Sequence, residues 1–313
     1  SVSHLRQEGQ RVFLDAEHFF DGYRANREYA LEVIRVAMEA GADVAALCDT
    51  NGGALPDEIA DVVHDVLGAT SARLGIHCHN DTGCAVANSM AAVLSGAGHV
   101  QGTLNGLGER TGNTNLTTVI PNLQLKLGYQ CLPEGRLDRL TAVSNHVAEV
   151  LNRPMNPQAP YVGTGAFAHK AGLHVSAIVR AKDAYEHVDP SLVGNGTRFV
   201  VSEMAGKATI NIKADELGLE LDGPAINQVI DDLKRLEHEG YHFEAADASF
   251  ELLVHEEMSG KRPSFFTIDH WLTTVERSED QSILTKAEVK VTAMGKQISC
   301  SGVGNGPVNA FDN

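Results

Sequence analysis

The chain has 313 residues, of which 43% are hydrophobic, and its 41 acidic and 25 basic residues give a formal net charge of -16. So large an acidic excess argues against nucleic acid or an anionic membrane as a partner. The sequence has no run of about 18 apolar residues and no signal peptide, and its five cysteines are scattered without a CxxC pair. We therefore expect a reduced, cytoplasmic protein.

Strand and helix patterns alternate through the first third of the chain. Strands are predicted over residues 11–17, 43–49, 73–79 and 99–105. Helices are predicted over residues 27–40, 55–67, 84–95 and 115–127, with Gly41, Gly68 and Gly128 as stops after three of them. The order of these elements predicts an α/β fold with a parallel sheet.

Each predicted strand ends in polar side chains. They are Asp15 and Glu17, Asp49 and Thr50, His77 and His79, and Asn105. Polar residues at successive strand ends are typical of the active face of a (β/α)8 barrel, whereas a doubly wound sheet gathers its ligand contacts at one switch point. A full barrel takes about 250 residues. The four units therefore predict the C-terminal half of a TIM barrel, with the early strands absent from this chain.

The pattern changes beyond residue 130. Helical stripes cover residues 137–151 and 224–239, and a proline-rich stretch and an irregular, glycine-containing segment lie between them. From residue 283 the apolar period becomes two, which predicts a hairpin. We expect a partial barrel over residues 1–168 and an α-rich linker domain over 169–281. The start of a small, truncated α+β regulatory domain is expected over 282–313.

The segment His77-Cys78-His79 is the strongest local indication of chemistry. Side chains at positions i and i+2 of a strand project from the same face, so both imidazoles can point at one divalent metal ion. An isolated His-x-His is more often a surface histidine beside a buried one. Its place at the end of a predicted strand favours the metal interpretation.

Three motifs, in this order, resemble the α-isopropylmalate/homocitrate/citramalate synthase family. They are residues 77–81 (HCHND), 102–113 (GTLNGLGERTGN) and 168–174 (AHKAGLH). The family consists of metal-dependent TIM-barrel enzymes that condense acetyl-CoA with a 2-oxo acid. Residues 13–23 and 47–53 look most like the citramalate synthase branch. The resemblance implies pyruvate as the oxo acid and a role in isoleucine biosynthesis.

The resemblance implies a role for each polar strand end. His77 and His79 would bind a divalent metal (Zn, Mn, Mg or Co), and a carboxylate from a barrel strand not in this chain would complete the site. Asn105 would be a metal ligand or would lie just behind the ligands, in contact with substrate. Asp49 and Thr50 would contact the oxo acid, and the alternative role for Thr50 is to cap the following turn.

The resemblance also implies residues that act on acetyl-CoA and on protons. Glu109 and Arg110 would lie near the acetyl-CoA thioester, and Glu17 is a candidate general base. His174 and Tyr185 would form a catalytic pair that reaches the active site of the partner subunit in a homodimer. Without the resemblance, a structural role for His174 would be favoured.

Three alternatives remain open. One is a 2-isopropylmalate or homocitrate synthase of the same family. Another is a barrel of the hydroxymethylglutaryl-CoA lyase or aldolase type, whose members share the His-x-His strand but lack the combination of His174, Tyr185 and a trailing β domain. The third is a catalytically incomplete fragment or scaffold, which the missing first-strand ligand favours for this chain.

Overall fold

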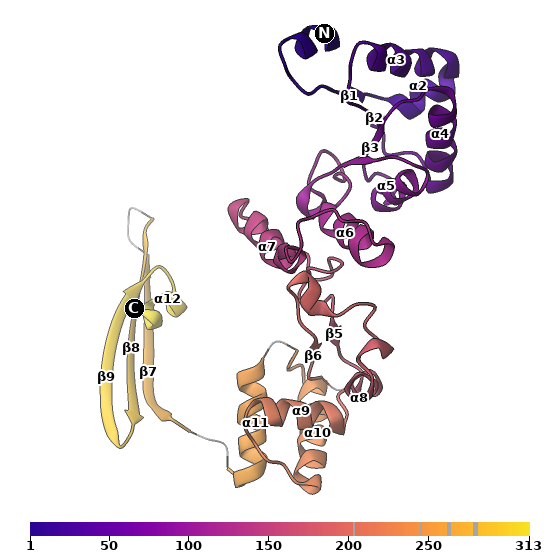
Figure 1. Ribbon diagram of the computed structural model, residues 1–313. Coiled ribbons are helices and arrows are strands. Elements are labelled where there is room, and N and C mark those ends of the chain that lie inside the picture. The colour runs from indigo at the N-terminus through magenta and orange to yellow at the C-terminus, as the bar shows by residue number, and fades with distance from the viewer. Residues whose placement is uncertain (203, 245, 262–263, 278–280) are drawn as a thin grey trace. The chain divides into compact units, whose positions relative to one another are not determined.

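The computed structural model describes the whole chain except residues 203, 245, 262–263 and 278–280. The chain divides into two compact units (Figure 1). The first contains residues 1–169 and 173–199, and the second contains residues 170–172 and 200–313. In the part of the chain that is described, no helix has the length and apolar character needed to cross a membrane.

A four-stranded parallel sheet organises the first unit. Its strands, in spatial order, are β1 (Phe13–Ala16), β2 (Val44–Asp49), β3 (Leu74–Cys78) and β4 (His99–Gln101). This confirms the four predicted strands and their parallel arrangement, although each is shorter than expected. We had expected Asn105 to end a strand, and it does not. It lies in the 3-10 turn η1 (Leu104–Gly106) with φ = 60°, because the chain leaves the sheet after Gln101.

Helices α2 (Phe19–Ala25), α3 (Arg27–Glu39), α4 (Pro56–Ala69) and α5 (Ala85–Leu94) lie along one face of this sheet in Figure 1. The short first helix, α1 (Val2–Gln7), lies apart from them and buries no residue. Asn26 caps α3 by accepting a hydrogen bond from the Tyr29 N–H, and Pro56 occupies the first turn of α4. Gly68 lies inside α4, so the stop predicted there is wrong.

The core of the first unit lies between the helices and the sheet. β2 is buried along its whole length, as expected for a central parallel strand. The apolar stripes of α3 and α4 pack against it, and the fully buried members of this cluster include Ile34, Leu47, Ile59, Val63 and Ile76. This packing fixes the strands and thereby the side chains at their carboxyl ends.

The rest of the first unit is more irregular. It contains α6 (Leu116–Pro121), the π-helical turn η2 (Asn122–Lys126), η3 (Leu137–Arg139), α7 (Leu140–Val150), β5 (Ala168–His169), α8 (Gly172–Arg180), η4 (Lys182–Ala184), η5 (Pro190–Val193) and β6 (Arg198–Phe199). β5 pairs with β6 in parallel. Residues 116–127 form one continuous helical run, which confirms the helix predicted over residues 115–127. Its form was not predicted: Pro121 has no N–H to donate, and the chain adopts the wider π form directly after it.

The second unit contains helices and an antiparallel sheet. Its helices are α9 (Lys207–Glu216), α10 (Gly223–His238), α11 (Asp247–Ser259) and α12 (Pro307–Asp312), and the strands of the sheet are β7 (Phe266–Arg277), β8 (Ile283–Ala293) and β9 (Lys296–Gly304). The predicted α10 stripe is buried, and the predicted β8–β9 hairpin turns at Gly295 with φ = 74°.

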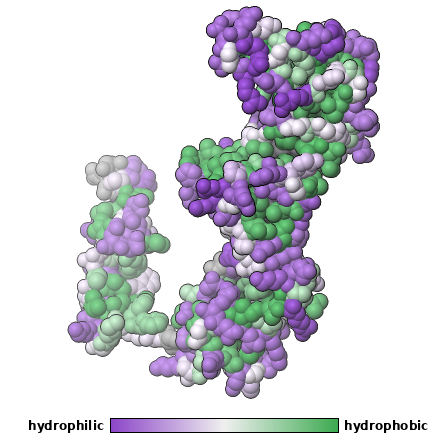
Figure 2. All heavy atoms as spheres, in the orientation of Figure 1, coloured by the Kyte–Doolittle hydropathy of each residue, from purple (hydrophilic) through white to green (hydrophobic). Residues whose placement is uncertain are grey.

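The strand β7 is not among the elements predicted from the sequence. This strand pairs with β8 along its length, but its register shifts between Ile268 and His270, which breaks the period-two pattern. The sheet therefore begins at Phe266, before residue 282, where we expected the last domain to start. Figure 2 shows hydrophobic patches on this sheet, where Ile268, Trp271 and Val275 are exposed.

Candidate metal and substrate site

The two histidines of the His-x-His motif lie at the carboxyl end of β3. His77 is in the strand, and His79 forms an isolated bridge with Asn113 just after it. Their ring centroids are 5.4 Å apart with 52° between the ring planes. Cys78, between them, is buried. The imidazoles thus lie side by side, as the spacing predicts.

A line of hydrogen bonds fixes the orientation of His77. Its Nδ1 lies 2.9 Å from Gln101 Oε1, and Gln101 Nε2 donates to Asp15 Oδ1 at 2.7 Å. An ionised carboxylate only accepts, so Gln101 must present its amide oxygen to His77. The proton therefore sits on Nδ1 and leaves a lone pair on Nε2. This is how ligating histidines are held in metal sites.

Asn113 is the third residue of this group. Its Nδ2 lies 3.3 Å from His77 Nε2. Within the described part of the chain, Asn113 Oδ1 and His79 Nδ1 are buried without a hydrogen-bond partner. Rotating the Asn113 amide by a half-turn would bring its oxygen towards the His77 lone pair, and a bound cation could then accept electron density from both. Two imidazoles and an amide oxygen form a donor set that fits a divalent metal.

The electrostatics of His79 suit the same role. Burial lowers the pKa of His79, and the nearby charges of Arg110 and His77 lower it further. The neutral imidazole is the form that binds metals. Among the described residues, no third His, Cys, Asp or Glu completes a cluster with the two histidines, and the amide of Asn113 is the neighbouring group that could add a further donor atom.

Asn105 is not part of this group, contrary to our expectation that its amide would bind the metal or lie just behind the ligands. Its Nδ2 donates to the Ser144 carbonyl at 2.9 Å, and Ser144 Oγ donates to its Oδ1 at 2.5 Å. The amide thus anchors η1 to α7. The signal that could have identified Asn113 instead is the glycine-rich segment before it, because a Cβ on Gly108 would collide with the Asn113 side chain.

Asp49 and Thr50 follow β2. The Asp49 carboxylate is buried and accepts hydrogen bonds from the Gly53 and Ala54 N–H groups, each at 3.2 Å. Burial raises the pKa of Asp49, and these hydrogen bonds oppose the shift. Thr50 Oγ1 accepts from the His18 N–H at 2.8 Å, so its own proton can go to another acceptor. The bonds favour a structural role for Asp49 and keep Thr50 available to a ligand.

The remaining predicted residues are more exposed. Glu17 follows β1, Glu109 lies in the loop over residues 106–113, and the Arg110 guanidinium binds the Asp81 carboxylate. His174 and Tyr185 form a separate pair whose rings stack with centroids 4.1 Å apart. The described contacts therefore join His77, His79 and Asn113 in one group, and His174 and Tyr185 in another.

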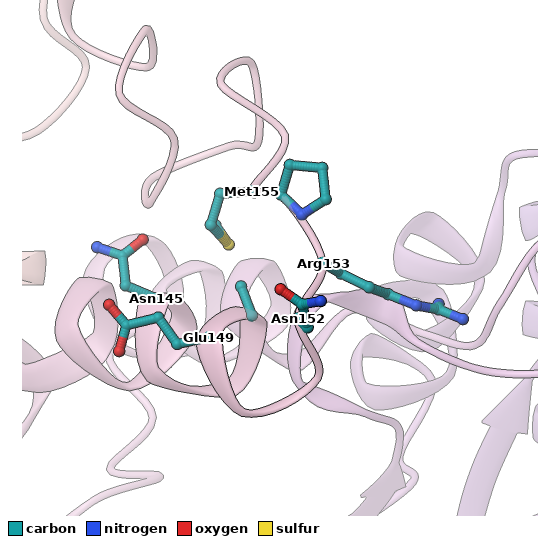
Figure 3. A pocket seen from close by; sticks show the side chains of 7 residues that line it. Asn145, Glu149, Asn152, Arg153 and Met155 are labelled. Carbon is teal, nitrogen blue, oxygen red and sulfur yellow. The ribbon is translucent and has the colours of Figure 1, made fainter. Parts of the chain in front are cut away.

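A hollow of about 550 Å³ lies along α7 and the loop after it. Figure 3 shows side chains that line it, including Asn145, Glu149, Asn152, Arg153 and Met155. Its lining contains none of the residues predicted from the sequence. One acidic and one basic side chain among amides indicate no particular chemistry, so we do not include this hollow in the site.

Three family models match consecutive parts of the chain. The HMGL-like model matches residues 2–147, the homocitrate synthase post-HMGL domain-like model matches 161–241, and the LeuA allosteric (dimerisation) domain model matches 244–313. Together they follow the chain in the order that the sequence motifs indicated.

Curated relatives agree with these models. An (R)-citramalate synthase from Streptomyces coelicolor is 54% identical, covering 100% of this chain and 59% of that protein. One from Aquifex aeolicus is 46% identical, covering 100% of this chain and 60% of its own length. A probable 2-isopropylmalate synthase from Methanopyrus kandleri is 36% identical over 76% of this chain and 47% of that protein. The chain thus spans less than two thirds of each of these relatives.

The chain is thus similar over its whole length to members of the α-isopropylmalate/homocitrate/citramalate synthase family, and its first part matches the HMGL-like model. Within this family it resembles the citramalate synthase branch, since five (R)-citramalate synthases are 44–54% identical across the whole chain.

Proposed function

We propose that this chain is part of an enzyme that condenses acetyl-CoA with pyruvate to give citramalate. The observation that carries the proposal is the 44–54% identity to (R)-citramalate synthases over 100% of the chain. The four β/α units would form the C-terminal half of the barrel within residues 1–168. The linker domain and a regulatory domain would follow them.

His77, His79 and Asn113 are the residues that would hold the metal. Their support is the line of hydrogen bonds through Gln101 and the two buried, unpartnered atoms of His79 and Asn113. A bound divalent cation (Zn, Mn, Mg or Co) supplies Lewis-acid activation of the ketone carbonyl. Asn105 is not proposed as a ligand, because its amide is hydrogen-bonded to Ser144.

The other residues would bind the reactants and move protons. Thr50 would donate its hydroxyl proton to the carboxylate of the oxo acid. Glu17, exposed after β1, would take the proton from the acetyl-CoA methyl group, and Glu109 would lie near the thioester. The stacked pair His174 and Tyr185 would supply acid–base chemistry near neutral pH to the partner subunit's site. The match to the LeuA dimerisation domain supports a homodimer.

The two asparagines give a direct test of the ligand set. In the full-length protein, Asn113→Ala is expected to weaken Mn²⁺ binding by at least about 10- to 100-fold, the loss typical even for residues that only support a ligand. Asn105→Ala should leave the affinity near the wild-type value and lower the melting temperature, because it breaks the bonds to α7. Isothermal titration with Mn²⁺ measures both. Equal affinities in the two variants would remove Asn113 from the ligand set.

The substrate assignment is tested by steady-state kinetics of CoA release. We expect the full-length protein to have its highest kcat/KM with pyruvate, compared with 2-oxoisovalerate and 2-oxoglutarate. The larger acids carry an isopropyl or a carboxyethyl group in place of the methyl group of pyruvate, and a group that does not fit the pocket costs on the order of 10-fold or more. A higher kcat/KM with 2-oxoisovalerate would assign the protein to the isopropylmalate branch. Cleavage of hydroxymethylglutaryl-CoA without condensation would favour the lyase alternative.

A further inference from the structure

We propose that Arg110 and Asp81 form a loop clamp, defined as their ion pair together with the hydrogen bond from Arg110 to the Thr50 carbonyl, and that this clamp positions Asn113 against His77. Arg110 is then a positioning residue and not a contact of acetyl-CoA, the role that the family resemblance implied for it. The inference rests on the proposed metal site.

The clamp joins three loops that follow different strands. Arg110 Nε lies 2.8 Å from Asp81 Oδ1, and Arg110 Nη2 lies 2.9 Å from Asp81 Oδ2. The same Nη2 donates to the Thr50 carbonyl at 2.6 Å. A bidentate pair of this kind fixes direction as well as distance. It therefore ties the glycine-rich loop to the turn after β3 and to the end of β2.

Backbone hydrogen bonds connect the loop clamp to Asn113, so the position of Arg110 affects the position of Asn113. Gly112 O accepts from the Asn80 N–H at 2.9 Å, and the Asn113 N–H donates to Gly106 O at 3.1 Å. Arg110 itself has φ = 57°, a left-handed conformation that a non-glycine residue keeps only when its surroundings hold it there. Releasing Arg110 would let the loop relax and move the Asn113 side chain away from His77.

Asp81, the other member of the loop clamp, packs closely against Gly52. A Cβ on Gly52, where φ = 62°, would lie 2.5 Å from Asp81 Oδ2. The Thr82 N–H donates to Gly52 O at 3.1 Å. The absence of a side chain at residue 52 thus lets Asp81 pack directly on the loop after β2, where it meets Arg110.

The guanidinium has little capacity left for a substrate. Of its five N–H donors, the one on Nε and both on Nη2 are used by Asp81 and Thr50. The Asp81 carboxylate, held by two hydrogen bonds from the guanidinium, compensates the charge of Arg110. A compensated cation attracts the phosphates of acetyl-CoA weakly, which favours the positioning role.

The test compares Mn²⁺ affinity and kinetics in the full-length protein. The variants are Arg110→Gln, Asp81→Asn, the double variant and Arg110→Lys. A second exposed bidentate pair in the same unit, Arg27 with Asp65 at 2.7 and 2.8 Å, provides the matched control Arg27→Gln. Free Mn²⁺ is followed by electron paramagnetic resonance without any substrate present, and melting temperatures are recorded for every variant.

We expect Arg110→Gln and Asp81→Asn each to weaken Mn²⁺ binding about 10- to 100-fold, as is typical when support of a ligand is lost. The double variant should be no worse than either single variant, because both remove the same interaction. Arg110→Lys should recover part of the affinity, and Arg27→Gln should retain all of it. The KM for acetyl-CoA should change little, while kcat at a fixed, subsaturating Mn²⁺ concentration falls with metal occupancy.

Three outcomes would overturn the clamp. Unchanged Mn²⁺ affinity with a raised KM for acetyl-CoA in Arg110→Gln alone would make Arg110 a substrate contact. Additive losses in the double variant would show that the two side chains act separately. Loss of cooperative melting in Arg110→Gln would mean that it supports the whole fold. If the wild-type protein binds no Mn²⁺ and releases no CoA, the proposed function fails instead, and the clamp with it.

Discussion

Replacing His77 by alanine in the full-length protein is expected to abolish metal binding and condensation together. The Nε2 lone pair of His77 is the donor that the Asp15–Gln101 line prepares, and alanine removes it. Lewis-acid activation of a carbonyl is worth several kcal/mol. Since each 1.36 kcal/mol is a factor of ten, we expect a loss of about 10³-fold or more in kcat.

Metal analysis and reconstitution check this result. Wild-type protein stripped with a chelator should regain activity when Mn²⁺ is restored, whereas His77→Ala should not. His64→Ala removes an exposed histidine on α4 and should behave like the wild type. Retention of a full complement of metal by His77→Ala would exclude His77 as a ligand.

Replacing His174 by alanine should lower the activity without removing the metal. We expect kcat to fall by on the order of 10²-fold or more, the usual contribution of a positioned acid or base. The metal content should stay at the wild-type level, because His174 contacts Tyr185 in the linker segment and not the His77 group. The two variants thus separate a residue that holds the cation from one that handles protons. Full activity in His174→Ala would leave it a structural histidine.

Mixing the two inactive variants tests whether His174 acts across the subunit interface. If it does, a dimer of one His77→Ala chain and one His174→Ala chain contains one site with both an intact metal centre and an intact His174. Such mixed dimers, purified through two different tags, should recover part of the wild-type activity. Mixed dimers as inactive as either parent would place His174 in its own subunit's site or outside any site.

The sequence could predict what depends on local periodicity. The strands at residues 13–16, 44–49 and 74–78 follow from apolar runs, and the position of His77 and His79 on one face follows from strand geometry. Their neighbourhood could not be predicted in the same way. Asn113 reaches His77 because its loop is bonded to the chain after β3, through contacts between residues more than thirty positions apart.

The errors have physical causes of the same kind. Asn105 was assigned to a strand end because the previous units each placed a polar residue there, but β4 is only three residues long. β7 was missed because its register shift hides the alternation. The helix over 115–127 was predicted from its stripe, and Pro121 changes its form. Each error arose where tertiary contacts or a backbone constraint outweighed the local pattern.

Because hydrogen bonds run from Asp15 through Gln101 to His77, the tautomer of His77 that can bind a metal depends on the correct register of β1. If β1 slipped by one residue, Asp15 would turn to the opposite face of the sheet. The Gln101 amide would then lose the acceptor that sets its orientation and could present its NH₂ group to His77. The imidazole would move its proton to Nε2 and could no longer coordinate a cation there. A misregistered sheet would thus produce an intact-looking but metal-free protein, with every ligand residue still in its sequence.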